Sequence, residues 1–370
     1  MSRTPPYDLA GVRFDDLGPR RVLHYHDPSA RLRALVVIDT IRDWPSGGGV
    51  RMAPDLTLTE IARLGRAMTY KYALLGMPIG GAKAGIWLDP ADPARDEVVA
   101  AFVAAIRPLV ESGAFVPGPD MGTKGADFPS PLAGASGDAS LDERLTGYGV
   151  VVAARTASEL AGRSLDGASV ALEGFGKVGT SAARFFAEEG ARVVAVSTVR
   201  SMVHHPDGLD VDAMIALREE HGDAGIERLP GARTMPREAL FETDVDVLVP
   251  GARPDAVNRD NVDAIRARWI VPGSNVPYAE GTLGALAERG TIALPDFVTN
   301  AGGVLATIAA LQGARGDAAL TLVRDAIERN VRRVSERARD TGATPYDAGI
   351  SIAREQLLGT KQEQRRETEQ

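Results

Sequence analysis

The chain has 370 residues, a formal net charge of −8 and no cysteine, and 44% of its residues are apolar while 25% are charged. This length exceeds what one hydrophobic core usually serves, so we expect two domains in a soluble globular protein. The acidic balance argues against nucleic acid or an anionic membrane as partner, and the lack of cysteine excludes disulfides, thiolate catalysis and Cys-ligated zinc.

The chain offers no targeting or metal-binding signal. Its first residues contain no apolar signal core, and no stretch approaches the roughly 20 apolar residues of a membrane span. None of the five histidines pairs with another at helical metal-ligand spacing. We therefore expect a cytoplasmic protein with no membrane span and no metal site.

The first third mixes strands and helices. A buried strand is expected over 34–40, a glycine-rich loop over 44–54 and a helix over 97–110. Thr57 and Glu60 form a capping-box signal that opens another helix. The small, polar segment 129–143 is expected to be a mobile loop.

A long helix is expected from Leu145, and after it strands alternate with helices. Short buried strands are expected over 245–250, 269–274 and 292–296. Strands separated by helices predict a parallel sheet, so the fold class is α/β. The C-terminal part is expected to be helical, with a frayed, charged tail over 360–370.

A dinucleotide site is predicted at Gly174, Gly176 and Gly179, which have G-x-G-x-x-G spacing. They follow an expected strand over 169–172 and open a helix, which is the context that this motif requires. The first glycine would make the tight turn, the second would let the backbone approach the pyrophosphate, and the third would allow close packing of helix on strand. The alternative is a tight turn without a ligand.

The next strand should end in an acidic residue that binds the ribose 2′-hydroxyl. That place is Thr198, and Arg200 follows two residues later. Neither residue repels a 2′-phosphate, so the sequence leans slightly towards NADP over NAD. The alternative is that Arg200 is a surface charge and that Thr198 binds the hydroxyl.

Two lysines and one aspartate stand out by their surroundings. Lys71 continues the apolar stripe of the helix that Thr57 opens, and Lys83 lies among glycines and alanines. A lysine in such a place is an anion clamp or an acid/base group with a lowered pKa, unless its ammonium reaches solvent. Asp120 lies in a rigid Pro/Gly turn, where it either transfers protons or stabilises the turn.

Seven segments resemble, in order, the glutamate/leucine/phenylalanine/valine dehydrogenase family. They run from about Gly48 to Val304 and read GGVRM, MTYKYALLGMPIGGAKAGI, PGPDMGT, TGYGV, EGFGKVG, LVPGA and LPDFVTNAGGV. The resemblance implies reversible NAD- or NADP-linked oxidative deamination of an L-amino acid to a 2-oxo acid and ammonia. It also implies a homo-oligomer of two-domain chains, with a cleft that closes to exclude water.

The resemblance implies roles for individual residues. Lys71 would hold the substrate α-carboxylate, Lys83 would polarise the carbonyl and the attacking water, and Asp120 would shuttle protons. Gly48, Asn300 and Thr307 would also meet the substrate. The resemblance and the glycine motif together assign these positions to the cofactor: Thr146, Gly174, Phe175, Gly176, Lys177, Val178, Gly179, Thr198, Arg200, Ala252, Asn275 and Asn300.

The implied domains are a substrate-binding, catalytic domain over 1–145, completed by 320–370, and a Rossmann-like domain over 146–319.

Glutamate-specific members carry a lysine before the Gly-Gly of their GG-x-R block, and here that position is Gly47. Because an unpaired buried carboxylate is costly, an apolar branched-chain or aromatic substrate is favoured. Thr307 points the other way, because glutamate enzymes tend to carry a hydroxyl there.

Three alternatives stay open. The first is a glutamate dehydrogenase. The second is a non-catalytic relative that binds a nucleotide or an amino acid. The third is a dehydrogenase of 2-hydroxy acids, which would want a histidine–carboxylate pair, and no histidine here lies in a plausible site motif.

Overall fold

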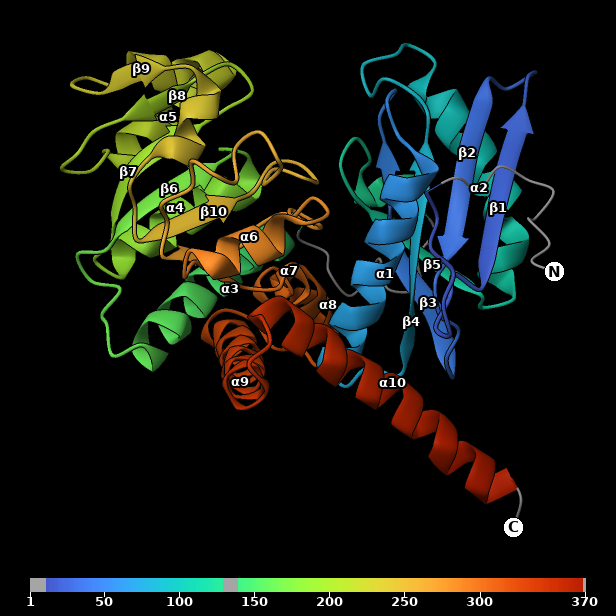
Figure 1. Cartoon of the computed structure of the whole chain (residues 1–370). Helices are drawn as coiled ribbons and strands as arrows, with labels where there is room; N and C mark the ends of the chain where they lie inside the picture. Colours follow the sequence, from blue (N-terminus) through green and yellow to red (C-terminus); the bar gives the residue numbers. More distant parts are fainter. Residues whose placement is uncertain (1–10, 129–138, 369–370) are drawn as a thin grey trace. The chain divides into compact units, whose positions relative to one another are not determined.

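The structure is a computed structural model that describes residues 11–128 and 139–368, with side chains over 11–128 and 144–359. The chain divides into two compact units (Figure 1). Unit 1 comprises Met1–Gly134 and Ala353–Gln370, and unit 2 comprises Ala135–Ile352.

Unit 1 is built on a five-stranded mixed sheet with the order β1-β2-β4-β3-β5. β3 runs parallel to both β4 and β5, whereas β2 is antiparallel to β1 and β4. The strands are β1 (Arg21–Asp27), β2 (Leu32–Ile38), β3 (Trp44–Met52), β4 (Ile79–Ile86) and β5 (Phe115–Pro119).

Each face of this sheet packs against a helix. Apolar side chains on one face, among them Val50 and Ala84, form a core with Phe102 of α2 (Arg95–Glu111). On the other face lies α1 (Leu58–Leu74), which begins as predicted at Thr57, whose hydroxyl accepts a hydrogen bond from the Glu60 amide. Because successive side chains alternate across a strand, glycines can line this second face while the core fills the first.

Residues 44–52 form a strand, so the prediction of a loop over 44–54 was wrong. β3 lies between β4 and β5 and pairs with both. Glycine is a poor strand former by itself, but here hydrogen bonding on both edges outweighs that preference. The segment 76–86 likewise contains a strand, β4, inside the same sheet.

Unit 2 contains a seven-stranded sheet with the order β12-β11-β10-β6-β7-β8-β9. The five strands from β12 to β7 are parallel, which confirms the predicted α/β class, and β8 and β9 add antiparallel pairs. They are β6 (Ser169–Glu173), β7 (Arg192–Ser197), β8 (Met202–His204), β9 (Arg233–Met235), β10 (Val247–Pro250), β11 (Trp269–Ile270) and β12 (Ile292–Ala293).

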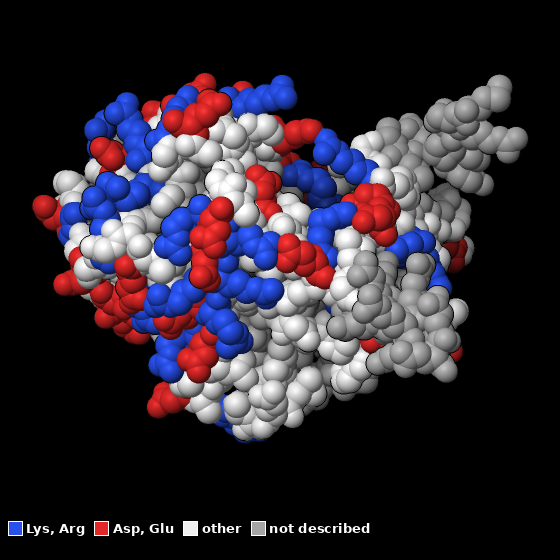
Figure 2. Space-filling view, turned by 60° about the horizontal axis from the view of Figure 1, so that its bottom comes forward, with Lys and Arg blue, Asp and Glu red and all other residues white. Residues whose placement is uncertain are grey.

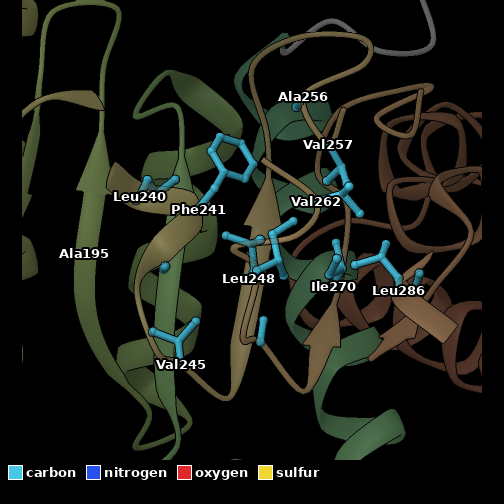
Figure 3. Close-up of a cluster of buried hydrophobic side chains, with 14 of the residues drawn as sticks. Ala195, Leu240, Phe241, Val245, Leu248, Ala256, Val257, Val262, Ile270 and Leu286 are labelled. Carbon is cyan, nitrogen blue, oxygen red and sulfur yellow. The ribbon is translucent and has the colours of Figure 1, made fainter. Parts of the chain in front are cut away.

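Buried apolar side chains form the core of unit 2 (Figure 3). Leu248 of β10, Ile270 of β11 and Leu286 of α6 (Thr282–Glu288) are at most 1% exposed, and Ile270 lies between the other two in this view. This core fixes the central parallel strands and the carboxyl ends from which a nucleotide site is built.

The remaining helices of unit 2 are α3 (Ala139–Leu160), α4 (Lys177–Glu188), α5 (Val211–His221), α7 (Asp296–Thr299), α8 (Gly302–Leu311), α9 (Asp317–Thr341) and the start of α10 (Pro345–Thr368). α3 begins within the segment expected to be a loop, whose first part, 129–138, lies outside the described residues. α10 runs on to Thr368, so the helix extends into the tail that was expected to fray.

The compact units divide the chain at 134/135, whereas the sequence suggested 145/146. Only 353–370 returns to unit 1, because α9 packs against α3 and α8 within unit 2.

No helix in the described ranges is both long and apolar enough to cross a bilayer. Lys and Arg side chains lie interspersed with Asp and Glu over the face shown in Figure 2.

Candidate active site

Lys83 lies on β4, on the sheet face that α1 covers. Its residue is only 3% exposed. Gly81 and Gly85 flank it on the same face, and a Cβ on Gly81 would lie 2.3 Å from the backbone nitrogen of Thr69 on α1. The glycines thus let the helix backbone lie directly on the strand, which removes water from around the lysine.

Asp120 follows β5 and is fixed by its own turn. Its amide donates to the hydroxyl of Thr123, which donates in turn to the carbonyl of Val50 on β3. One carboxylate oxygen accepts from the Met121 amide at 2.7 Å. The other forms an ion pair with the Lys83 ammonium. The sequence singled out both residues but did not predict their pairing, which the structure shows.

Glycines on β3 make room for this pair. A Cβ on Gly49 would lie 2.9 Å from Cβ of Asp120 and 3.1 Å from Nζ of Lys83. A Cβ on Gly48, which was predicted to meet the substrate, would lie 1.7 Å from the carbonyl oxygen of Ala82. Any side chain at either position would displace β4 or the ion pair, so Gly48 contributes through its backbone.

Arg51 is a site residue that the sequence did not single out. It is 7% exposed, and its Nε lies 3.3 Å from Asp120 Oδ2 while its Nη1 lies 2.7 Å from Glu60 Oε1. Two cations, Lys83 and Arg51, thus face Asp120, and Glu60 balances the charge of Arg51. A signal was present, because Arg51 lies two residues after Gly49 and alternation places both on one strand face.

The protonation of this cluster follows from burial and charge. Burial lowers the pKa of Lys83, and the nearby Arg51 lowers it further, although Asp120 acts in the opposite direction. Burial alone would raise the pKa of Asp120, but the Lys83 and Arg51 cations together hold it well below the usual range of a carboxyl. The site therefore combines an amine that loses its proton more easily than usual with a persistent carboxylate.

Lys71 and Tyr72 bring two more functional groups to the buried part of α1. Lys71 is 4% exposed, which agrees with its predicted inward position. The Tyr72 hydroxyl lies 2.8 Å from where a Cβ on Gly47 would be. That hydroxyl has no hydrogen-bond partner within the described residues, and burial raises its pKa. Tyr72 thus occupies the space that a side chain at position 47 would need.

The glycine motif in unit 2 has the backbone geometry of a dinucleotide turn. Gly174 has a φ of +87°, and a Cβ on Gly179 would lie 2.0 Å from the Gly174 carbonyl oxygen. Nothing lies within 4 Å of a Cβ built on Gly176, where α4 begins. A pyrophosphate therefore has open space at a helix N-terminus, and the residues fit a nicotinamide dinucleotide. Phe175 is 2% exposed, so it adds only backbone there.

Glu173, directly before the motif, was not predicted. Its Oε2 accepts from the amides of Gly251 and Ala252 at 3.2 and 3.3 Å. These bonds hold Ala252 beside Gly174, where a Cβ on the glycine would lie 3.2 Å from Ala252 Cβ. Burial raises the pKa of Glu173 although both amides stabilise its charged form. Ala252, which the resemblance assigned to the cofactor, therefore lies beside the glycine turn.

The loop after β7 carries Thr198 and Arg200. Thr198 is 7% exposed, and its hydroxyl accepts from the Arg200 amide at 3.3 Å. The Arg200 guanidinium does not lie free, because its Nε is 3.3 Å from Glu227 Oε1. Ser201 also donates to that oxygen, at 2.8 Å. Nothing in the sequence pointed to Glu227, which lies almost thirty residues further along the chain.

The other predicted residues of unit 2 lie on separate elements. Asn300 Nδ2 donates to the Ser274 carbonyl at 2.9 Å and to the Asn275 side chain at 3.0 Å, so two predicted residues are joined directly. Thr146 lies on α3. Thr307 lies on α8 and is half-buried.

Known proteins resemble this chain over most of its length. The family model described as "Glutamate/Leucine/Phenylalanine/Valine dehydrogenase" matches residues 137–364, and the "Glu/Leu/Phe/Val dehydrogenase, dimerisation domain" model matches 19–129. A glutamate dehydrogenase of Thermotoga maritima is 34% identical, over 70% of this chain and 67% of that protein. The NADP-specific glutamate dehydrogenase A1 of Halobacterium salinarum is also 34% identical, over 70% and 67%.

Solved structures agree. A hetero-hexameric glutamate dehydrogenase from Thermus thermophilus, in a leucine-bound form, superposes with a TM-score of 0.80 at 26% identity, over 92% of this chain and 88% of that one. An L-tryptophan dehydrogenase from Nostoc punctiforme gives a TM-score of 0.66 at 24% identity, over 93% and 98%, and shares the fold.

Proposed function

The chain belongs to the glutamate/leucine/phenylalanine/valine dehydrogenase family, and we propose that it oxidatively deaminates an L-amino acid to a 2-oxo acid and ammonia, with NAD or NADP as acceptor. The observation that carries this proposal is the buried group of Lys83, Asp120 and Arg51. Deamination needs a carboxylate that moves protons to and from nitrogen, and a cation or amine that acts on oxygen. One dry face of a sheet supplies both.

The residues divide the work by their charge state. Bound NAD or NADP supplies the acceptor for the hydrogen and electron pair that leave Cα. Asp120, which is ionised in the resting site, takes a proton from the amino group, holds it transiently and returns it to the departing ammonia. Lys83, with its lowered pKa, accepts a proton from the attacking water and stabilises the oxygen that forms. Lys71 holds the α-carboxylate.

We propose an apolar branched-chain or aromatic amino acid as substrate. Gly47 carries no cation, and the Tyr72 ring fills the adjacent space with a neutral group. A carboxylate brought there would be desolvated without a counter-charge, whereas an apolar side chain loses little. Gly47 and Gly49 lie two residues apart on one strand face, so this neutral region begins about 7 Å from the Lys83–Asp120 pair.

Glutamate is the second candidate, because glutamate dehydrogenases are found both among the proteins similar in sequence and among those similar in structure. Thr307 also supports it, as a hydroxyl at the position where glutamate enzymes tend to carry one. The homo-oligomer and the cytoplasmic location that the sequence suggested are part of the same proposal. The hetero-hexameric Thermus protein supports assembly into an oligomer, and that its subunits are identical rests on the resemblance alone.

The test is turnover of the purified protein with NAD⁺ and NADP⁺ against a panel of L-amino acids at alkaline pH. Leucine, valine or phenylalanine should be the best substrate. Turnover with glutamate alone would reject the apolar assignment but keep the family reaction. If no amino acid is turned over while NADH still binds, the protein is a non-catalytic relative and the proposed reaction is rejected.

A further inference from the structure

We infer that Glu227 makes this protein select NAD over NADP, by holding Arg200 and by placing a carboxylate where the extra phosphate of NADP would lie. The inference rests on the proposed use of a nicotinamide dinucleotide. It concerns a residue outside every sequence motif. It also changes the meaning of Arg200, which favoured NADP only as a free cation.

The ribose end of the site can be located from the backbone. β6 and β7 are adjacent and parallel, with Glu173 beside Ser197. The Gly174 amide donates to the Ser197 carbonyl at 3.0 Å, so the glycine turn touches the carboxyl end of β7. A dinucleotide whose pyrophosphate lies at such a turn places its adenosine ribose against the end of the next strand. Here that end is Thr198.

Glu227 is held against this strand end from two directions. The 3₁₀ segment η2 (Gly222–Arg228) is tied to the loop after β7 by Thr198, whose hydroxyl donates to the Asp223 carbonyl at 3.4 Å. Ser201, which is 8% exposed, anchors the Glu227 carboxylate itself at 2.8 Å. The carboxylate therefore has a fixed place beside the loop that would meet the ribose.

Charge then decides between the two cofactors. Hydrogen bonds from Ser201 and Arg200 lower the pKa of Glu227, so it is ionised at neutral pH. Its negative charge occupies Arg200, the cation that a 2′-phosphate would need. A 2′-hydroxyl carries no charge and meets no such repulsion. NADP thus faces a carboxylate and an engaged arginine, whereas NAD does not.

The experiment measures the binding of NADH and NADPH to the whole protein by fluorescence titration, which needs no turnover. The wild-type protein should bind NADH more tightly. Glu227→Gln should strengthen NADPH binding about tenfold and leave NADH within about threefold, because it removes the negative charge and releases Arg200. The ratio of kcat/KM for the two cofactors should shift in the same sense.

Two further variants make the result specific. Glu227→Gln combined with Arg200→Ala should lose the gain for NADPH, since no freed arginine remains to bind the phosphate. Glu328→Gln is the matched control, because Glu328 is also a partly exposed glutamate that is paired with an arginine, Arg332, on α9. It should change neither affinity.

The outcomes separate this inference from the proposed function. A wild-type preference for NADPH, or an unchanged NADH/NADPH ratio in Glu227→Gln, would overturn the role of Glu227 alone. A failure to bind either nucleotide would overturn both this role and the proposed dehydrogenase activity.

Discussion

At the scale of single residues, the protonation of the site depends on how few carboxylates lie close to its buried cations. Lys83 and Arg51 both face Asp120, and Glu60 is the only other carboxylate paired in this cluster within the described residues. Two unit charges 4 Å apart interact by roughly 4 kcal/mol at an effective dielectric constant of 20. Repulsion from Arg51 and burial therefore both lower the pKa of Lys83, while the attraction of Asp120 partly offsets this effect.

The first prediction concerns the pH dependence of this lysine. Since the pKa of Lys83 is lowered, kcat/KM should rise with pH as the ammonium deprotonates and should level off below the ordinary lysine pKa. Lys83→Ala should lower kcat by about 10²- to 10⁴-fold and abolish this rise. The measurement is the pH profile of kcat/KM.

Lys83→Arg separates charge from proton transfer, because arginine stays protonated throughout. It should be as inactive as Lys83→Ala. If the arginine variant kept the activity and the profile, Lys83 would act as a fixed cation only.

At the scale of elements, α1 packs closely along β4 because the spacing of every fourth helix residue nearly equals the spacing of every second strand residue. Ile61 lies over Gly85, Gly65 over Lys83 and Thr69 over Gly81, and the helix runs against the strand direction. Four helical residues rise about 6 Å and two strand residues about 6.6 Å, so the contacts stay in step over two turns. The alternate glycines of β4 are what allows this approach.

The second prediction tests that fit. Gly81→Val should destabilise the protein by about 2–4 kcal/mol, because its Cβ alone would lie within 2.6 Å of three atoms of Thr69. Urea unfolding gives the loss of stability, and kcat should fall with it because Lys83 lies on the same strand.

Gly125→Ala is the control within unit 1, where nothing lies within 4 Å of a built Cβ. It should change stability by less than about 0.5 kcal/mol. Equal losses in both variants would mean that the packing of α1 on β4 does not depend on Gly81.

The same elements show what the sequence could predict. Periodicity and capping located α1, and the glycine motif located Gly174 and the start of α4, because these signals are local. The strand β3 was missed, since its conformation comes from pairing with β4 and β5 on both edges. Tyr72 and Glu227 were missed for a similar reason, because each matters through a partner far away in the sequence.

At the scale of the whole molecule, unit 1 joins the two ends of the described chain. Asp15, in the N-terminal segment, pairs with Arg66 on α1 and with Arg354 on the part of α10 that belongs to unit 1. Arg66 also pairs with the buried Asp39 at 2.8 Å. One charge network thus ties an N-terminal loop, a central helix and the C-terminal helix together, although they are far apart in sequence.

The third prediction is that acid loosens this network. The pKa of Asp15 is lowered, since the Arg66 cation and the amides of Leu17 and Gly18 outweigh its burial. A lowered folded-state pKa contributes stability that is fully present above the unfolded value of about 3.9 and is lost as pH falls through the folded value. The urea concentration at the midpoint of unfolding should therefore decrease once the pH falls below about 4.

Asp15→Asn should lower the midpoint at pH 7 and converge with the wild-type protein in acid, because both then lack the carboxylate charge. Asp96→Asn is the control, since the Asp96 side chain is 93% exposed and an exposed ion pair with Arg95 contributes little. It should follow the wild-type curve at every pH. Parallel curves for Asp15→Asn and the wild-type protein would instead mean that the charge of Asp15 does not account for the loss of stability in acid, and that the apolar core of unit 1 rather than this network joins the ends of the chain.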